Sequence, residues 1–327
     1  MTKVEVALVL GGGGARGLAH IGILKVLEKN HIPIHLIVGT SMGAFVGGFY
    51  AAGTGIALME ELALSVDRTF VAKMLSPSLS TSGLVDGERV RSYLEEFLGD
   101  LHIEELRIPF SSVSTDLTTG EEVILSRGPL ADAIMASIAI PALFKPVRYE
   151  DRYLVDGGLV NPLPVSVAHR LGADVIIAVN ITQVLSKVGK SNRGEGAFRL
   201  NKTISTLKER LLLQMRKFDW KKIDENDPPG KEKDPVDSTL TDAAPPHVFQ
   251  TLMQSVAVIE TKLQALHLAQ WPADVLISPV IRGINVLDFH RAKELIDCGE
   301  EAANTALPHI CSAIEDRTKK LKETMGS

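Results

Sequence analysis

The chain has 327 residues, of which 45% are hydrophobic and 23% charged, and its formal net charge is −5. These values are typical of a globular protein with a substantial core, and they exclude the chain-wide basic charge of a nucleic-acid-binding protein. Cys298 and Cys311 fit neither a zinc site nor a redox CxxC motif, so we expect reduced thiols in separate C-terminal helices of a cytoplasmic protein. No apolar run approaches the roughly 18 residues of a membrane span, and we expect no signal peptide.

Strands and helices alternate along the first half of the chain, as judged from apolar runs and helical periodicity. This order predicts an α/β fold of three layers, α/β/α, with a mostly parallel central sheet and a helical insertion. The expected strands cover residues 4–10, 34–38, 110–115, 122–126, 145–149, 152–155, 174–179 and 273–278. The expected helices cover residues 18–28, 44–52, 56–70, 87–98, 130–138, 161–171, 198–223, 248–268, 288–303 and 306–322.

A short apolar run ends on Gly39-Thr-Ser41-Met-Gly43, and small residues that suit a helix follow at once. A strand, a sharp turn and a helix are the context that a nucleophile elbow needs, and the two glycines allow the turn to close. We therefore predict that Ser41 lies at the apex of the turn with its hydroxyl exposed. The alternative interpretation is a serine that only caps the following helix.

Four consecutive glycines follow the first predicted strand, and Gly12-x-Gly14-x-x-Gly17 matches the dinucleotide fingerprint. However, the second strand ends without the carboxylate that would hold a ribose, and Gly17 is not followed by the Lys-Ser/Thr pair of a P-loop. We favour an oxyanion hole, because consecutive glycines let several backbone N–H groups converge on one point. Arg16 either holds this loop, attracts a phosphate-bearing substrate, or is an ordinary surface arginine.

A serine hydroxyl needs a base to become a nucleophile at neutral pH. Nine histidines are scattered along the chain, and His20 comes one helical turn after the glycine loop. None of those that follow Asp156 sits at a loop tip after a strand, where the histidine of a Ser-His-Asp triad belongs. Asp156 itself ends a strand-like run and precedes Gly157 and Gly158, so its carboxylate would lie on an open turn. The same Asp-Gly-Gly sequence is also favourable turn chemistry without any catalytic role.

Three motifs, at 12–17, 39–43 and 156–158, resemble in this order the patatin-like phospholipase family. Residues 115–121 and 136–141 also resemble that family, in its bacterial branch near the neuropathy-target-esterase catalytic domain. The resemblance covers about the first 180 residues of the chain. In the family an Asp often precedes the first glycine of this motif, and this chain has Gly11 at that position.

The resemblance implies hydrolysis of a fatty-acyl ester of a phospholipid or lysophospholipid through an acyl-serine intermediate, with no metal or organic cofactor. It implies a Ser-Asp dyad without histidine, in which Ser41 is the nucleophile and Asp156 is its direct base. The alternative is a catalytically silent regulatory or scaffolding protein on the same fold. The oxyanion-hole donors that the resemblance implies are Gly12, Gly13 and Gly14, with Arg16 at their edge.

The composition changes over residues 186–246, which we interpret as an insertion within a single domain that covers 1–327. Residues 198–223 predict a basic amphipathic helix, which either lies on an anionic membrane surface or packs with its charged side in water. Residues 224–246 are rich in Asp, Lys and Pro, as disordered loops are. We expect a lipid substrate and no nucleic acid, and we leave open peripheral contact with the inner face of the membrane and the oligomeric state.

Overall fold

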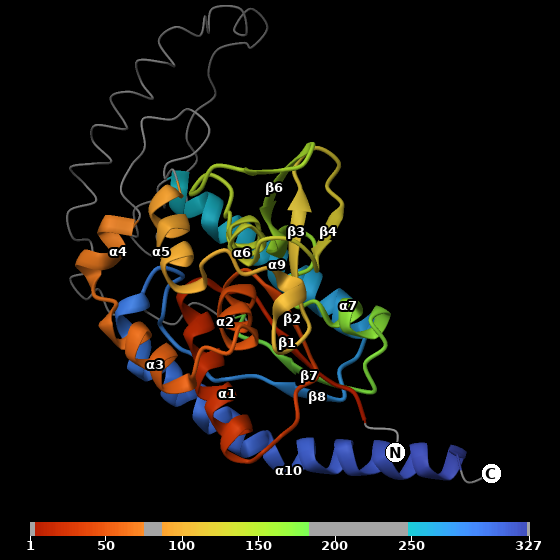
Figure 1. Ribbon diagram of the computed structural model, residues 1–327. Helices are drawn as coiled ribbons and strands as arrows, with labels where there is room; N and C mark the ends of the chain where they lie inside the picture. The colour runs from red at the N-terminus through yellow and green to blue at the C-terminus, as the bar shows by residue number, and fades with distance from the viewer. Residues whose placement is uncertain (1–3, 75–86, 183–247, 326–327) are drawn as a thin grey trace, which may run out of the picture. The chain divides into compact units, whose positions relative to one another are not determined.

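We describe a computed structural model of the chain, in which residues 4–74, 87–182 and 248–325 are described (Figure 1). Eight strands form one sheet with the order β5-β6-β3-β2-β1-β7-β8, and β4 pairs with β3 beside this path. The strands are β1 (Val6–Leu10), β2 (Leu36–Thr40), β3 (Phe110–Asp116), β4 (Glu122–Leu125), β5 (Val147–Tyr149), β6 (Arg152–Asp156), β7 (Val175–Val179) and β8 (Val275–Ile277).

The centre of the sheet is parallel, and one margin is antiparallel. Strands β3, β2, β1, β7 and β8 pair in parallel, as consecutive strands joined by helices do. Strand β3 pairs antiparallel with β4 and with β6, and β6 pairs antiparallel with β5. The predicted mostly parallel sheet is confirmed, and β3 and β4 form an antiparallel hairpin.

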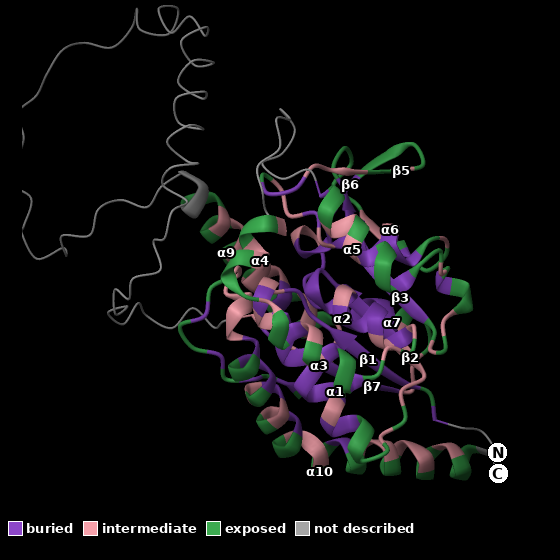
Figure 2. Cartoon of the chain, turned by 60° about the vertical axis from the view of Figure 1, so that its left-hand side comes forward, coloured by how far each residue is buried: buried purple, intermediate pink, exposed green. Residues whose placement is uncertain are grey.

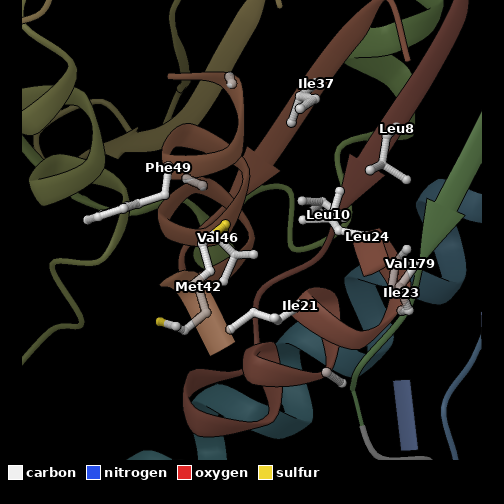
Figure 3. Close-up of a cluster of buried hydrophobic side chains, with 14 of the residues drawn as sticks. Leu8, Leu10, Ile21, Ile23, Leu24, Ile37, Met42, Val46, Phe49 and Val179 are labelled. Carbon is white, nitrogen blue, oxygen red and sulfur yellow. The ribbon is translucent and has the colours of Figure 1, made fainter. Parts of the chain in front are cut away.

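The alternating side chains of β1 reach two separate hydrophobic cores. Val6, Leu8 and Leu10 join the larger core, which includes buried residues of α1, α2 and α10 and is seen in part in Figure 3. Ala7 and Val9 join the smaller core, which includes residues of α7 and, packed against it, of α9. Because successive side chains of a strand point to opposite faces, helices cover both faces of the sheet. The buried strands β1 and β7 accordingly lie between helical layers in Figure 2, and the predicted three-layer α/β/α fold is confirmed.

Most helices agree with the expected ones, with differences of a few residues at their ends. Short 3-10 turns occur at η1 (Gly14–Leu18), η2 (Ile103–Glu105), η3 (Gly157–Leu159) and η5 (Phe289–Arg291). The α-helices are α1 (Ala19–Lys29), α2 (Met42–Ala51), α3 (Ile56–Ser65), α4 (Arg68–Met74), α5 (Glu88–Leu98), α6 (Leu130–Ser137), α7 (Val165–Arg170), α9 (Val248–Gln270) and α10 (Ala292–Met325).

The single helix expected over 56–70 is wrong, because the chain breaks between α3 and α4. Val66 takes extended backbone angles, and the Asp67 carboxylate accepts a hydrogen bond from the Phe70 N–H at 2.6 Å, which starts the next helix. Two helices expected at the C-terminus are also wrong, because α10 runs through Pro308 without interruption. Its packing along α1 outweighs the hydrogen bond that Pro308 cannot donate, and both cysteines lie on this one helix.

The expected insertion over 186–246, with its basic helix at 198–223, lies outside the described residues. The chain on either side of it shares one sheet, because β8 after the insertion pairs in parallel with β7 before it. Among the described helices, none combines the length and the apolar character needed to cross a membrane.

Candidate active site

The register of β3 brings two distant strand ends together. Strands β2 and β6 pair with the same edge of β3, since β4 occupies the other edge. Thr40 at the end of β2 lies opposite Val113, and Asp156 at the end of β6 lies opposite Ser114, the next residue along. Strand β2 runs parallel to β3 and β6 runs antiparallel, so their C-terminal ends meet head to head. Ser41 follows the first end, and Asp156 forms the second.

Ser41 sits in a strained turn between β2 and α2. Its backbone angles are φ 54° and ψ −124°, which a residue with a side chain rarely adopts. The turn closes only because its flanking residues lack Cβ atoms: a Cβ on Gly39 would lie 2.5 Å from the Ala44 nitrogen, and one on Gly43 would lie 2.0 Å from the Leu10 oxygen. The predicted strand, turn and helix are thus present, and the backbone at Ser41 has the strained conformation of a nucleophile elbow.

Ser41 and Asp156 form a short hydrogen bond. The Ser41 Oγ donates to Asp156 Oδ2 at 2.6 Å, and the two residues are 5% and 4% exposed. The predicted exposure of the Ser41 hydroxyl is therefore wrong, because the residues packed around the turn bury it. The Gly158 N–H donates to the other carboxylate oxygen at 2.8 Å, and the Thr115 hydroxyl donates to the Asp156 carbonyl at 2.8 Å. Burial raises the pKa of Asp156 to about 6, although the hydrogen bonds from Ser41 and Gly158 oppose this change. The carboxylate is therefore a stronger base than an exposed aspartate, and it is ionised at neutral pH.

Ser137 supports the nucleophile from the end of α6. Its Oγ accepts the Ser41 N–H at 2.9 Å and donates to the Val113 carbonyl at 2.6 Å, so it links the elbow to β3. We did not predict this residue as part of the site. In the sequence, Ser137 is marked only by its position within residues 136–141, one of two further segments that resemble the family. Thr115 lies in the other segment, 115–121.

The glycine loop lies next to Ser41, but its three candidate donors differ. A Cβ on Gly12 would lie 3.2 Å from the Ser41 Cβ, so this residue contacts the nucleophile. However, the Gly12 N–H already donates to the Pro162 carbonyl at 2.9 Å. The N–H groups of Gly13 and Gly14 have no hydrogen-bond partner among the described residues. An N–H group that already donates within the protein is not available to a substrate oxygen. We therefore restrict the predicted oxyanion-hole donors to Gly13 and Gly14.

Arg16 is held by a hydrogen bond to a distant segment of the chain. Its Nε donates to the Ile284 carbonyl at 3.2 Å. Burial lowers the pKa of Arg16, while the nearby charges of Glu260 and Asp288 raise it. The half-buried guanidinium thus connects the glycine loop to the segment before α10, as expected of a residue that supports the loop.

His20 does not serve Ser41 as a base. Its Nε2–H donates to the Gly11 carbonyl at 2.9 Å, and burial lowers the pKa of His20 to about 4, so the ring is neutral. Its position one helical turn after the glycines instead fixes the start of the loop. His267 is also engaged elsewhere, through a hydrogen bond of 3.0 Å between its Nδ1 and Asn161 Oδ1.

An apolar cavity of about 190 Å³ opens beside Ser41 and Gly14. Helix α2 contributes a ridge of side chains to it, of which Met42, Val46 and Phe49 are drawn in Figure 3. The remaining wall comes from η1, α1, α3, α4, α5, the segment after α6, the residues before η5 and η5 itself. These wall residues are almost all apolar and include Met59, Ala63, Val66, Phe70, Tyr93, Leu143, Phe144 and Leu287. In the described part of the chain, no group of three or more His, Cys, Asp or Glu residues could hold a metal ion.

Comparison with known proteins identifies the family. The family model described as patatin-like phospholipase matches residues 8–169, which include the elbow, the glycine loop and Asp156. An uncharacterized NTE family protein of Mycobacterium bovis is 34% identical over 335 residues, covering 93% of this chain and 91% of that protein. The chain belongs to the patatin-like phospholipase family. The resemblance read from the motifs is therefore confirmed, and membership in this family implies lipid acyl hydrolase activity.

More distant relatives share less of this patatin-like chain. Patatin-like phospholipase domain-containing protein 6 of Mus musculus is 32% identical over 187 residues, which are 55% of this chain and 14% of the mouse protein. The crystal structure of VipD from Legionella pneumophila aligns with a TM-score of 0.41 and 14% identity, over 93% of this chain and 67% of VipD. The likeness to VipD is too low to bear on function.

Proposed function

We propose that this patatin-like protein hydrolyses fatty-acyl esters of phospholipids or lysophospholipids, with Ser41 as nucleophile and Asp156 as its direct base. The observation that carries the proposal is the 2.6 Å hydrogen bond from the Ser41 Oγ to Asp156 Oδ2 at the mouth of an apolar cavity. A buried carboxylate in this position accepts the serine proton as the hydroxyl attacks the ester carbonyl.

The negative charge on the carbonyl oxygen is then stabilised by the N–H groups of Gly13 and Gly14. One donor of this kind is worth about 3–4 kcal/mol in the barrier of acyl transfer. Asp156 returns its proton to the departing alcohol, which leaves an acyl-serine. Water attacks this intermediate in the second half of the reaction, with Asp156 again as the base.

The cavity provides a place for the acyl chain. Its walls offer apolar side chains from α2, α3 and α5, and burying each methylene of a chain there contributes about 0.8 kcal/mol. A cavity of about 190 Å³ holds only part of a long chain, so we expect the remainder to lie toward the opening. Contact of residues 198–223 with an anionic membrane stays a separate prediction, tested by sedimentation with anionic and neutral vesicles. A single domain over 1–327 likewise stays a prediction.

The proposal is tested by covalent labelling and by turnover. We expect a fluorophosphonate probe to modify Ser41, as located by mass spectrometry, and Ser41→Ala to lose both the adduct and the hydrolysis of p-nitrophenyl esters. Ser312→Ala, an exposed serine on α10, is the matched control and keeps both. Products from mixed diacyl lipids, lysolipids and simple esters then define the substrate class.

Two results would contradict the proposal. Turnover that survives in Ser41→Ala would move the chemistry to another residue. A wild-type protein with neither adduct nor turnover would favour a catalytically silent regulatory or scaffolding protein on the same fold.

A further inference from the structure

Helix α9 places a third ionisable side chain beside the dyad. A Cβ on Gly158 would lie 2.4 Å from Glu260 Oε1 and 3.1 Å from Asp156 Oδ1. Both carboxyl groups therefore lie next to Gly158, which also donates its N–H to Asp156. Within the described residues, the Glu260 carboxyl group has no hydrogen-bond partner. A half-buried carboxyl group set against the base of a dyad lies close enough for its charge to act on that base.

The charged groups around Glu260 come from two other elements. Asp156 on β6 faces it with a negative charge, and Arg16 in η1 faces it with a positive one. Asp288, just before η5, is the other carboxylate near Arg16 and competes for its charge. Burial and, to a smaller extent, the negative charge of Asp156 raise the pKa of Glu260 to about 8, against the opposing effect of the Arg16 charge.

We propose that Glu260 is a positioning residue of the dyad, which keeps its proton while Asp156 is ionised and, on losing that proton, makes Asp156 a stronger base. This inference rests on the proposed function of Ser41 and Asp156. Two carboxyl groups that share a partly buried site do not ionise independently, because the first negative charge opposes the second. Glu260 lies against Gly158, whose N–H donates to Asp156, so the Glu260 charge acts directly on Asp156.

The pH dependence of Ser41 acylation tests the coupling. We expect the rate constant of fluorophosphonate labelling in wild-type protein to rise with pH near 6, as Asp156 ionises, and to rise again by about threefold or more above pH 7. Glu260→Gln has nearly the same shape but cannot ionise, and it should keep the first rise and lose the second. Glu315→Gln, an exposed acid on α10, is the matched control and should keep both. A single rise in wild-type protein, or a second rise that survives in Glu260→Gln, would overturn the proposal.

A second measurement does not depend on activity. In protein with ¹³C-labelled glutamate carboxyl groups, the Glu260 signal is identified by its absence from Glu260→Gln. We expect its titration midpoint to fall by about one pH unit or more in Asp156→Asn, because the neighbouring negative charge is gone. The same midpoint in both proteins would refute the coupling. If instead Ser41 is never acylated but the midpoint falls, the proposed reaction is wrong and the coupling of the two carboxyl groups stands.

Discussion

Asp156→Asn should inactivate the protein and stabilise it. In the folded state the pKa of Asp156 is raised by burial to about 6 from its ordinary value of 3.8, so ionising it there is unfavourable. The protonated Asp156 side chain therefore favours the folded state. Its contribution to the free energy of unfolding is complete below the ordinary pKa and is lost as the pH rises through about 6. At 1.36 kcal/mol for each pKa unit, the loss at pH 8 is about 3 kcal/mol.

Asparagine at position 156 removes the negative charge and can keep both hydrogen bonds of the side chain. Its carbonyl oxygen can accept from the Gly158 N–H, and its amide can donate to the Ser41 oxygen, where the carboxylate now accepts. We expect urea unfolding, followed by tryptophan fluorescence, to give a free energy of unfolding higher by about 3 kcal/mol at pH 8 and by roughly half of that at pH 5.

The control is Asp174→Asn, which should change the free energy of unfolding in the opposite direction. Burial acts to raise the pKa of Asp174, but hydrogen bonds from the Glu5 N–H and from Arg317 lower it overall. Asp174→Asn should therefore destabilise the protein at pH 8, with a loss that shrinks as the pH falls toward 3. The reasoning fails if Asp156→Asn is no more stable than wild type at pH 8, or if its gain does not change between pH 5 and pH 8.

Two further substitutions test the support of the nucleophile and the cavity. Ser137→Ala leaves the buried Ser41 N–H without its acceptor and removes a donor from the Val113 carbonyl, so the free energy of unfolding should fall by about 2 kcal/mol or more and fluorophosphonate labelling should slow. Unchanged stability and labelling, as expected of an exposed-serine control, would remove Ser137 from the site. Ala63→Trp fills the cavity wall on α3 and should raise the KM for a C16 p-nitrophenyl ester at least tenfold, leaving a C4 ester unaffected. Equal losses on both esters would place the acyl chain elsewhere.

The sequence was sufficient where a feature depends on neighbouring residues. The elbow around Ser41 was predictable because a strand, two glycines and a helix are consecutive in the chain. The buried strands β1, β2 and β7 were predictable because apolar runs of that length are typical of parallel sheets. The positions where helices end were less predictable. A proline usually ends an isolated helix, but α10 continues through Pro308 because it packs along α1.

The rest of the site depends on contacts between distant segments. The place of Asp156 came from a resemblance, because no local pattern states which edge of β3 accepts β6. Glu260 was missed for the same reason: in an amphipathic helix, a lone acid looks like a side chain in water. Its partners Asp156 and Arg16 lie on elements more than 100 residues earlier in the chain, and only the folded structure brings them to it. The Gly12 N–H likewise donates to the carbonyl of Pro162, a residue far from the glycine loop in the sequence.

The head-to-head arrangement of β2 and β6 makes the chemistry sensitive to a single step of strand pairing. Side chains alternate along a strand, so a slip of β6 by one residue against β3 would turn the Asp156 side chain to the opposite face of the sheet. Such a misfolded protein would retain nearly all of its buried core, yet Ser41 would have no base. Catalytic competence in this fold is thus a more stringent test of correct folding than compactness or helix content.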